Sequence, residues 1–90
     1  MHQILYHHSV VRDDIPKLDV TARRVIRQAI EKKLTTAPQT FGKPLRRSLK
    51  GYRKLRVGDY RVVFRVTGNT VYILAILHRS FVYKESERRT

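Results

Sequence analysis

The chain contains no cysteine and few acidic residues. Among its 90 residues, 7 Asp and Glu stand against 20 Lys and Arg, which gives a formal net charge of +13. The absence of cysteine excludes disulfide bonds, thiolate metal sites and a cysteine nucleophile. The excess of positive charge points to a polyanionic partner, which is a nucleic acid, an anionic membrane surface or an acidic protein.

The sequence also lacks long apolar runs. Its unbroken apolar segments are far shorter than the roughly 18 residues that span a bilayer, and its first residues lack the apolar region of a signal peptide. We therefore expect a cytoplasmic protein that does not associate with a membrane. Because the chain is shorter than the roughly 150 residues typical of a domain, residues 1–90 are predicted to form one domain with a modest core.

The N-terminal part predicts a strand and two helices. Residues 2–7 are predicted to form a short strand buried on both sides. Residues 9–18 indicate a short helix that Ser9 caps and Pro16 kinks or splits. Residues 19–34 show a helical apolar stripe opposite a basic face. The stripe consists of Ala22, Val25, Ile26, Ala29, Ile30 and Leu34. The short link between the helices predicts an antiparallel helical hairpin.

The C-terminal part predicts an antiparallel meander. Residues 35–51 contain prolines and glycines without a sustained period, which indicates a long loop. Strand-like runs follow at residues 52–57, 60–67 and 71–77. Gly58-Asp59 and Gly68-Asn69 separate them and suit tight hairpin turns. Residues 80–90 are polar and basic, with at most a short helical turn. The predicted fold class is α+β.

Positive charge is concentrated on the predicted strands and the loop before them. Residues 43–65 contain nine basic residues and one acid. Alternation along adjacent strands predicts that Lys54, Arg56 and Arg61 share one face of the sheet. Arg79 and Tyr83 lie just past the last strand and are expected to converge on the same face. Arginines interleaved with tyrosines are typical of surfaces that bind RNA or single-stranded nucleic acid.

The run GYRKLRVGDYRVVFRV at residues 51–66, followed by HRSFVY at residues 78–83, resembles the RelE/ParE superfamily of bacterial toxins. The resemblance implies a small domain in which a sheet packs on a helical hairpin. In RelE-type members it implies a metal-independent, ribosome-dependent endoribonuclease that cuts mRNA. It also implies a cognate antitoxin that wraps the toxin in a hetero-oligomer.

The resemblance further implies roles for individual residues. Lys54 matches the lysine that activates the 2′-hydroxyl, and Arg61 matches the arginine that stabilises the scissile phosphate. Arg79 matches the arginine near the leaving oxygen, and Tyr83 matches a tyrosine that stacks on a nucleotide. These residue types suit attack by a 2′-hydroxyl, which needs a base and fixed positive charge. Further RNA contacts are expected from Arg46, Arg47, Lys50, Arg53 and Arg56.

Two features leave the chemistry open. Tyr52 occupies the position at which some RelE members have a second lysine. His78 lies next to Arg79, and an imidazole titrates closer to neutral pH than an amine does, so either Lys54 or His78 is a candidate base. The other histidines have no carboxylate or cysteine at ligand spacing. We therefore expect neither a metal site nor a cofactor.

Two other functions remain as alternatives. One is a ParE-like inhibitor of DNA gyrase that cleaves nothing, and the other is a basic RNA-binding module without catalytic activity. ParE members usually lack the full set of Lys54, Arg61, Arg79 and Tyr83, so the resemblance favours the nuclease.

Overall fold

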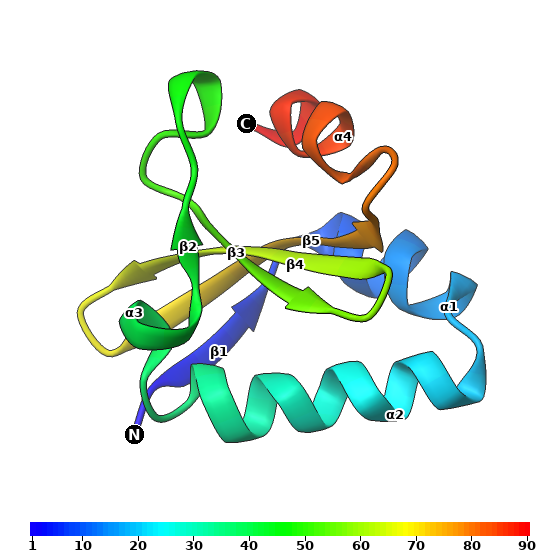
Figure 1. The fold of residues 1–90 in the computed structure, drawn as a ribbon, viewed down its shortest axis with the longest axis horizontal. Helices are drawn as coiled ribbons and strands as arrows, with labels where there is room; N and C mark the ends of the chain where they lie inside the picture. Colours follow the sequence, from blue (N-terminus) through cyan, green and yellow to red (C-terminus); the bar gives the residue numbers. More distant parts are fainter.

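The computed structural model describes residues 1–90 and shows an α+β domain built on one five-stranded sheet (Figure 1). The strands are β1 (Gln3–Tyr6), β2 (Lys43–Pro44), β3 (Arg53–Val57), β4 (Tyr60–Thr67) and β5 (Thr70–His78). They lie in the order β1-β5-β4-β3-β2. β1 pairs with β5 in parallel, and the other pairs are antiparallel. The predicted α+β class and the meander β3-β4-β5 are confirmed.

Helices lie on both sides of the sheet (Figure 1). The N-terminal ones are η1 (Val10–Asp14), α1 (Ile15–Lys17), α2 (Val20–Ala29) and η2 (Ile30–Leu34), of which η1 and η2 are π-helical turns. The later ones are α3 (Pro38–Phe41), the 3₁₀ turn η3 (Arg47–Leu49) and α4 (Val82–Arg89). α2 packs below the sheet and α4 above it. None of these helices is long and apolar enough to cross a membrane.

The second predicted helix forms as expected. The Asp19 side chain accepts a hydrogen bond of 2.7 Å from the Ala22 amide and so caps the helix. Ile26, Ile30 and Leu34 are buried against the sheet. They belong to a core of 11 buried residues to which η1, α2, η2, β3, β4 and β5 contribute. The prediction fails at Val25, whose exposed fraction is 44% because it lies at the side of the apolar stripe.

The first predicted helix differs at its cap. The Ser9 side chain makes no capping hydrogen bond. Pro16 lies in the first turn of α1, where its missing amide hydrogen leaves no bond unmade. The interruption appears as a change from π-helical to α-helical geometry just before Pro16, and the segment ends at Leu18, whose backbone is extended.

β1 is less buried than expected. Its residues Leu5 and Tyr6 are 46% and 41% exposed. The strand pairs only with β5, so it forms an edge of the sheet. Ile4 packs partly against the core. The prediction of burial on both sides is therefore wrong.

The predicted loop at residues 35–51 contains α3, β2 and η3. Gly42 lies so close to β4 that an added Cβ would stand 2.3 Å from Cζ of Phe64. Only glycine lets the backbone pass over this buried ring without displacing it. The chain then turns into β2, which adds a fifth strand beside β3.

The C-terminal tail forms a full helix, α4, where only a short turn was expected. Val82 and Ser86 lie one turn apart on its inner face and are fully buried, and the Ser86 hydroxyl donates to the Val82 carbonyl oxygen. Val82 joins a second, smaller core on this side of the sheet with Leu49, Val63, Leu74 and Ala75. Two inward-facing residues were too few to produce a helical pattern in the sequence.

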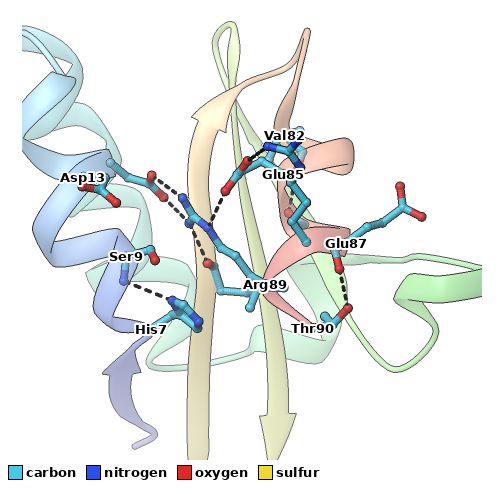
Figure 2. A network of polar contacts seen from close by, with 12 residues as sticks. His7, Ser9, Asp13, Val82, Glu85, Glu87, Arg89 and Thr90 are labelled. Carbon is cyan, nitrogen blue, oxygen red and sulfur yellow. Dashed lines mark hydrogen bonds and ion pairs between the residues drawn. The ribbon is translucent and has the colours of Figure 1, made fainter.

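A buried ion pair ties α4 to the N-terminal part of the fold (Figure 2). The Arg89 guanidinium donates to both carboxylate oxygens of Asp14 at 2.7 and 2.8 Å. It also donates to the Leu74 carbonyl oxygen at 3.0 Å, while Asp14 accepts from the Ile76 amide. These hydrogen bonds raise the pKa of Arg89 above its ordinary value, and the nearby Glu85 adds to this.

Leu74 is the extra residue of a β-bulge. Val63 pairs with Ala75 and Phe64 with Ile73, so Leu74 has no partner on β4. Both Leu74 and Ala75 consequently point toward α4. Arg89 satisfies the carbonyl group that the bulge removes from the ladder.

Candidate functional site

β3 presents opposite chemistry on its two faces. Leu55 and Val57 pack into the core on the α2 side. Lys54 is paired with Val63, and Arg56 lies directly opposite Arg61 on β4. Because side chains alternate along a strand, Lys54, Arg56 and Arg61 share the α4 side of the sheet. The predicted common face is confirmed.

The cations line one pocket of about 370 Å³ at the outer edge of β3. β2 pairs with β3 only at Arg53 and Lys54, so the edge beyond Lys54 has no neighbouring strand. The lining consists of Lys33, Phe41, Lys43, Lys54, Leu55, Arg56 and Arg61. Five positively charged side chains among the seven lining residues make this a site for a polyanion.

Four of the seven lining residues were not among the site residues expected from the sequence, namely Lys33, Phe41, Lys43 and Leu55. Lys33 belongs to η2, where it reads as part of a solvated helix face, and its Nζ lies 5.6 Å from the ring centre of Phe41. Lys43 starts β2 and lies opposite Lys54. Lys43 belongs to the basic run at residues 43–65, but only tertiary folding brings Lys33 and Lys43 together with Lys54.

Tyr83 joins the site from α4. Lys54 Nζ lies 5.4 Å from the centre of the Tyr83 ring, a cation–π contact. The first turn of α4 positions this ring, and the packing of Val82 beside it fixes that turn. The structure therefore brings Lys54 and Tyr83 together, although they are far apart in the sequence.

Arg61 and Arg79 converge on the turn between β3 and β4. Arg61 Nη1 donates to the carbonyl oxygens of Gly58 and Tyr60 at 3.0 and 2.9 Å, which orients the guanidinium. Gly58 adopts a left-handed conformation with φ of 59°. Arg79 Nε lies 3.9 Å from the Asp59 carboxylate, and both side chains are exposed. Arg79 is not among the residues that line the pocket.

His78 lies apart from the other candidates. It is paired with Tyr60, and the two rings are 6.0 Å apart between centres. Tyr60 packs against the core on the α2 side, so the His78 ring points away from Lys54. Its Nδ1 accepts a hydrogen bond from the Ser80 amide at 3.1 Å. The structure does not bring His78 to the pocket.

The expected RNA-contacting arginines and lysines divide into two groups. Arg53 points to the α2 side, where its Nη1 donates to the carbonyl oxygens of Gly42 and Gln39 at 2.9 and 3.3 Å. It anchors α3 to β3 and is turned away from Lys54. The others are exposed: Arg56 at the pocket, and Arg46, Arg47 and Lys50 around η3. No three His, Asp or Glu side chains form a group that could hold a metal ion.

Comparison with known proteins identifies the family. Residues 5–83 match the sequence model of the ParE toxin of the type II toxin-antitoxin system parDE. The chain belongs to the RelE/ParE toxin superfamily. Toxin RelG of Mycobacterium tuberculosis is 33% identical over 78 residues, which cover 84% of this chain and 90% of RelG. Toxin RelE of the same organism is 42% identical over 53 residues, which cover 57% of this chain and 55% of that toxin.

Solved structures of the superfamily share the fold. A chain of the toxin-antitoxin complex RelBE2 from Mycobacterium tuberculosis superposes with a TM-score of 0.79 at 31% identity, covering 87% of this chain and 98% of that chain. A chain of the RelB-RelE antitoxin-toxin complex from Methanococcus jannaschii superposes with a TM-score of 0.66 at 23% identity, covering 90% and 96%. The second likeness concerns the fold alone.

Proposed function

We propose that this toxin is an endoribonuclease that cuts mRNA on the ribosome, in the cytoplasm, and that a cognate antitoxin holds it inactive. The observation that supports the proposal most strongly is the shared pocket of Lys54, Arg56 and Arg61 with Tyr83 against the lysine. A single ribose-phosphate unit placed there meets an amine, two guanidinium groups and an aromatic ring.

The proposed reaction is an internal transesterification. The 2′-oxygen attacks the adjacent phosphorus, the 2′-proton passes to the Lys54 amine, and the bond from phosphorus to the 5′-oxygen breaks. Arg61 and Arg56 stabilise the negative charge that grows on the phosphate oxygens. Arg79 stabilises the departing 5′-oxygen, which takes up a proton from solvent water, and the Lys54 ammonium then returns its proton to solvent. Tyr83 stacks on a base and aligns the attack. These side chains supply the positive charge, so the proposed mechanism uses no metal ion.

Lys54 is the proposed base in preference to His78. Proton transfer needs the base within hydrogen-bond reach of the 2′-hydroxyl. Lys54 lies in the pocket with Arg61, whereas the His78 ring lies beside Tyr60 on the opposite face. A pH profile of the cleavage rate in His78→Gln that matches the parent chain would support this assignment.

The proposed antitoxin partner is supported by charge and by the structural neighbours. Two of the structures that share the fold are toxin-antitoxin complexes. The net charge of +13 favours an acidic partner, and a disordered acidic segment that folds on binding is able to wrap such a surface. The expected product is a toxin-antitoxin hetero-oligomer that covers the pocket.

The decisive experiment measures cleavage by the purified chain. End-labelled mRNA bound to ribosomes is incubated with the parent chain, Arg61→Ala, Lys54→Ala and Arg24→Ala. We expect codon-linked cuts from the parent chain and a rate roughly 10²- to 10³-fold lower in Arg61→Ala. Arg24 is an exposed arginine of α2 on the other side of the molecule, so Arg24→Ala should cut normally. Equal rates for Arg61→Ala and the parent chain would overturn the site.

Inhibition of DNA gyrase is the second candidate function, because the matching family model is that of ParE. The same purified chain is therefore tested in a supercoiling assay. Blocked supercoiling together with intact mRNA would replace the nuclease proposal with gyrase inhibition. A chain that binds RNA but does neither would be a binding module.

A further inference from the structure

A row of planar side chains crosses the α4 side of the sheet. The guanidinium carbon of Arg65 on β4 lies 5.4 Å from the ring centre of Tyr52 and 5.5 Å from that of Tyr72. Tyr72 is the direct partner of Arg65 in the ladder between β4 and β5. Arg53 of β3 is paired with Phe64 of β4. One residue further along this antiparallel register, Tyr52 lies opposite Arg65. We call Tyr52, Arg65 and Tyr72 the stacking row.

The stacking row faces the same side as the candidate site. Tyr52 and Tyr72 pack at the margin of the smaller core beneath α4, and Arg65 alternates with Phe64 and Val66, which point to the α2 side. Tyr52 lies just before β3 and precedes Lys54 by two residues, a step of roughly 6.6 Å in extended chain. The row and the pocket are therefore adjacent parts of one basic surface.

The row remains accessible and carries an unneutralised charge. Arg65 is exposed, and Tyr52 and Tyr72 are half-buried. Arg65 makes no ion pair, although five ion pairs form elsewhere in the chain. A cation in contact with two aromatic rings and without a carboxylate partner offers both positive charge and π surface to a ligand.

Two histidines extend the planar surface toward β1. The His7 ring stands at 62° to the Tyr72 ring with 6.3 Å between centres, and His8 stacks on His7 at 4.2 Å. Burial lowers the pKa of His7, and nearby positive charges add to this. His7 is therefore an uncharged ring at neutral pH.

We propose that the stacking row binds bases of the same single-stranded RNA whose phosphate occupies the pocket of Lys54 and Arg61. The choice of RNA as the ligand rests on the proposed function. Aromatic rings and arginine planes stack on unpaired bases of any sequence, and adjacent cations hold the backbone. The row extends the contact with RNA beyond the nucleotides that react.

The experiment compares a base-bearing ligand with a baseless one. Binding of the purified chain to fluorescent 2′-O-methyl oligouridylate, which has no free 2′-hydroxyl to react, is measured by anisotropy at fixed salt. The competing ligand is an abasic sugar-phosphate oligomer of equal length and charge. We expect the base-bearing ligand to bind roughly 5- to 150-fold more tightly, the range for loss of a stacked base.

Matched variants assign the preference to the row. In Tyr52→Leu and Tyr72→Leu we expect the preference for the base-bearing ligand to fall severalfold, to the part that stacking on Tyr83 supplies, while Tyr72→Phe retains the full preference. Tyr6→Leu is the control, because Tyr6 is 41% exposed and lines a groove on the α2 side of the sheet. Circular dichroism establishes that each variant remains folded.

Several outcomes would overturn the proposal. One is equal affinity of the parent chain for both ligands, and another is a preference in a folded Tyr52→Leu/Tyr72→Leu double variant that is as large as that of the parent chain. A third outcome is that the parent chain binds a poly-glutamate peptide more tightly than RNA and that Arg65→Gln loses this binding. That result would assign the row to an acidic protein instead. Because this assay needs neither ribosomes nor cleavage, a base preference without mRNA cutting would refute the nuclease while supporting the row.

Discussion

The two sides of the sheet differ in what covers them. On the α2 side, 11 buried apolar residues form a continuous core with the helices. On the α4 side the core has only five buried apolar residues, and the remaining surface holds the lysines, arginines and tyrosines of the candidate site. One strand serves both sides, since Leu55 is buried while Lys54 and Arg56 face the pocket. Repulsion between the positive charges on the α4 side opposes folding, and burial of the larger core on the α2 side offsets this repulsion.

The largest expected effect comes from breaking the link between the two sides. Asp14→Ala leaves Arg89 buried without its carboxylate, and we expect a loss of about 3–5 kcal/mol in the free energy of unfolding. Urea denaturation measures this loss. RNA cleavage should fall as well, because α4 carries Tyr83. The double variant Asp14→Leu/Arg89→Met, which removes both charges, should recover most of the stability. A single variant as stable as the parent chain would show that the pair does not hold α4.

A neighbouring pair on β3 tests the comparison directly. Leu55→Ala should cost about 2–5 kcal/mol in the free energy of unfolding, because Leu55 is buried in the core on the α2 side. Arg56→Ala should change stability by less than about 0.5 kcal/mol, because its side chain is exposed. Urea melts of both variants decide the matter. Similar losses in the two would mean that the faces are not divided as described.

A smaller effect is expected at the crossing of Gly42 over β4. Gly42→Ala places a methyl group against the buried Phe64 ring, so we expect overpacking to cost about 1–3 kcal/mol. Thermal denaturation provides the measurement. The double variant Gly42→Ala/Phe64→Leu lacks the aromatic ring, so part of the overpacking should be relieved in it. Additive losses in the double variant would contradict the contact.

The smallest effect concerns acidic pH. Burial and nearby positive charge lower the pKa of His7 in the folded chain, so the unfolded chain binds a proton more readily than the folded one. The contribution of His7 is fully present above about pH 6.5 and is lost as the pH falls through the folded pKa. Melting temperatures at pH 7.5 and 5.5 should differ less in His7→Gln than in the parent chain. His2→Gln controls for removal of another imidazole, and an unchanged difference in His7→Gln would refute the prediction.

The regular parts of this fold could be predicted from the sequence because their patterns are local. Alternation located β3, β4 and β5, the glycines located their turns, and helical spacing located α2. β2 and α4 were missed for the opposite reason. β2 has two residues, and α4 has only Val82 and Ser86 buried against the sheet, so neither leaves a periodic signal.

The candidate site was partly predictable for the same reason. Lys54, Arg56 and Arg61 follow from strand alternation, and the resemblance added Tyr83 and Arg79. Alternation also placed Arg53 on the opposite side of β3, where the structure shows it bonded to the carbonyls around α3. Lys33 and Lys43 depend on how η2 and β2 pack around the edge of β3, which no local pattern specifies.

The parallel pairing of β1 with β5 affects when the domain can form. β1 must wait for residues 70–73 before it has a neighbour, and Asp14 must wait for Arg89, 75 positions later. Since a nascent chain emerges from its N-terminus, β5 and the helix bearing Tyr83 are synthesised after the other four strands. Residue 89 must therefore emerge from the ribosome before the chain can form the complete fold.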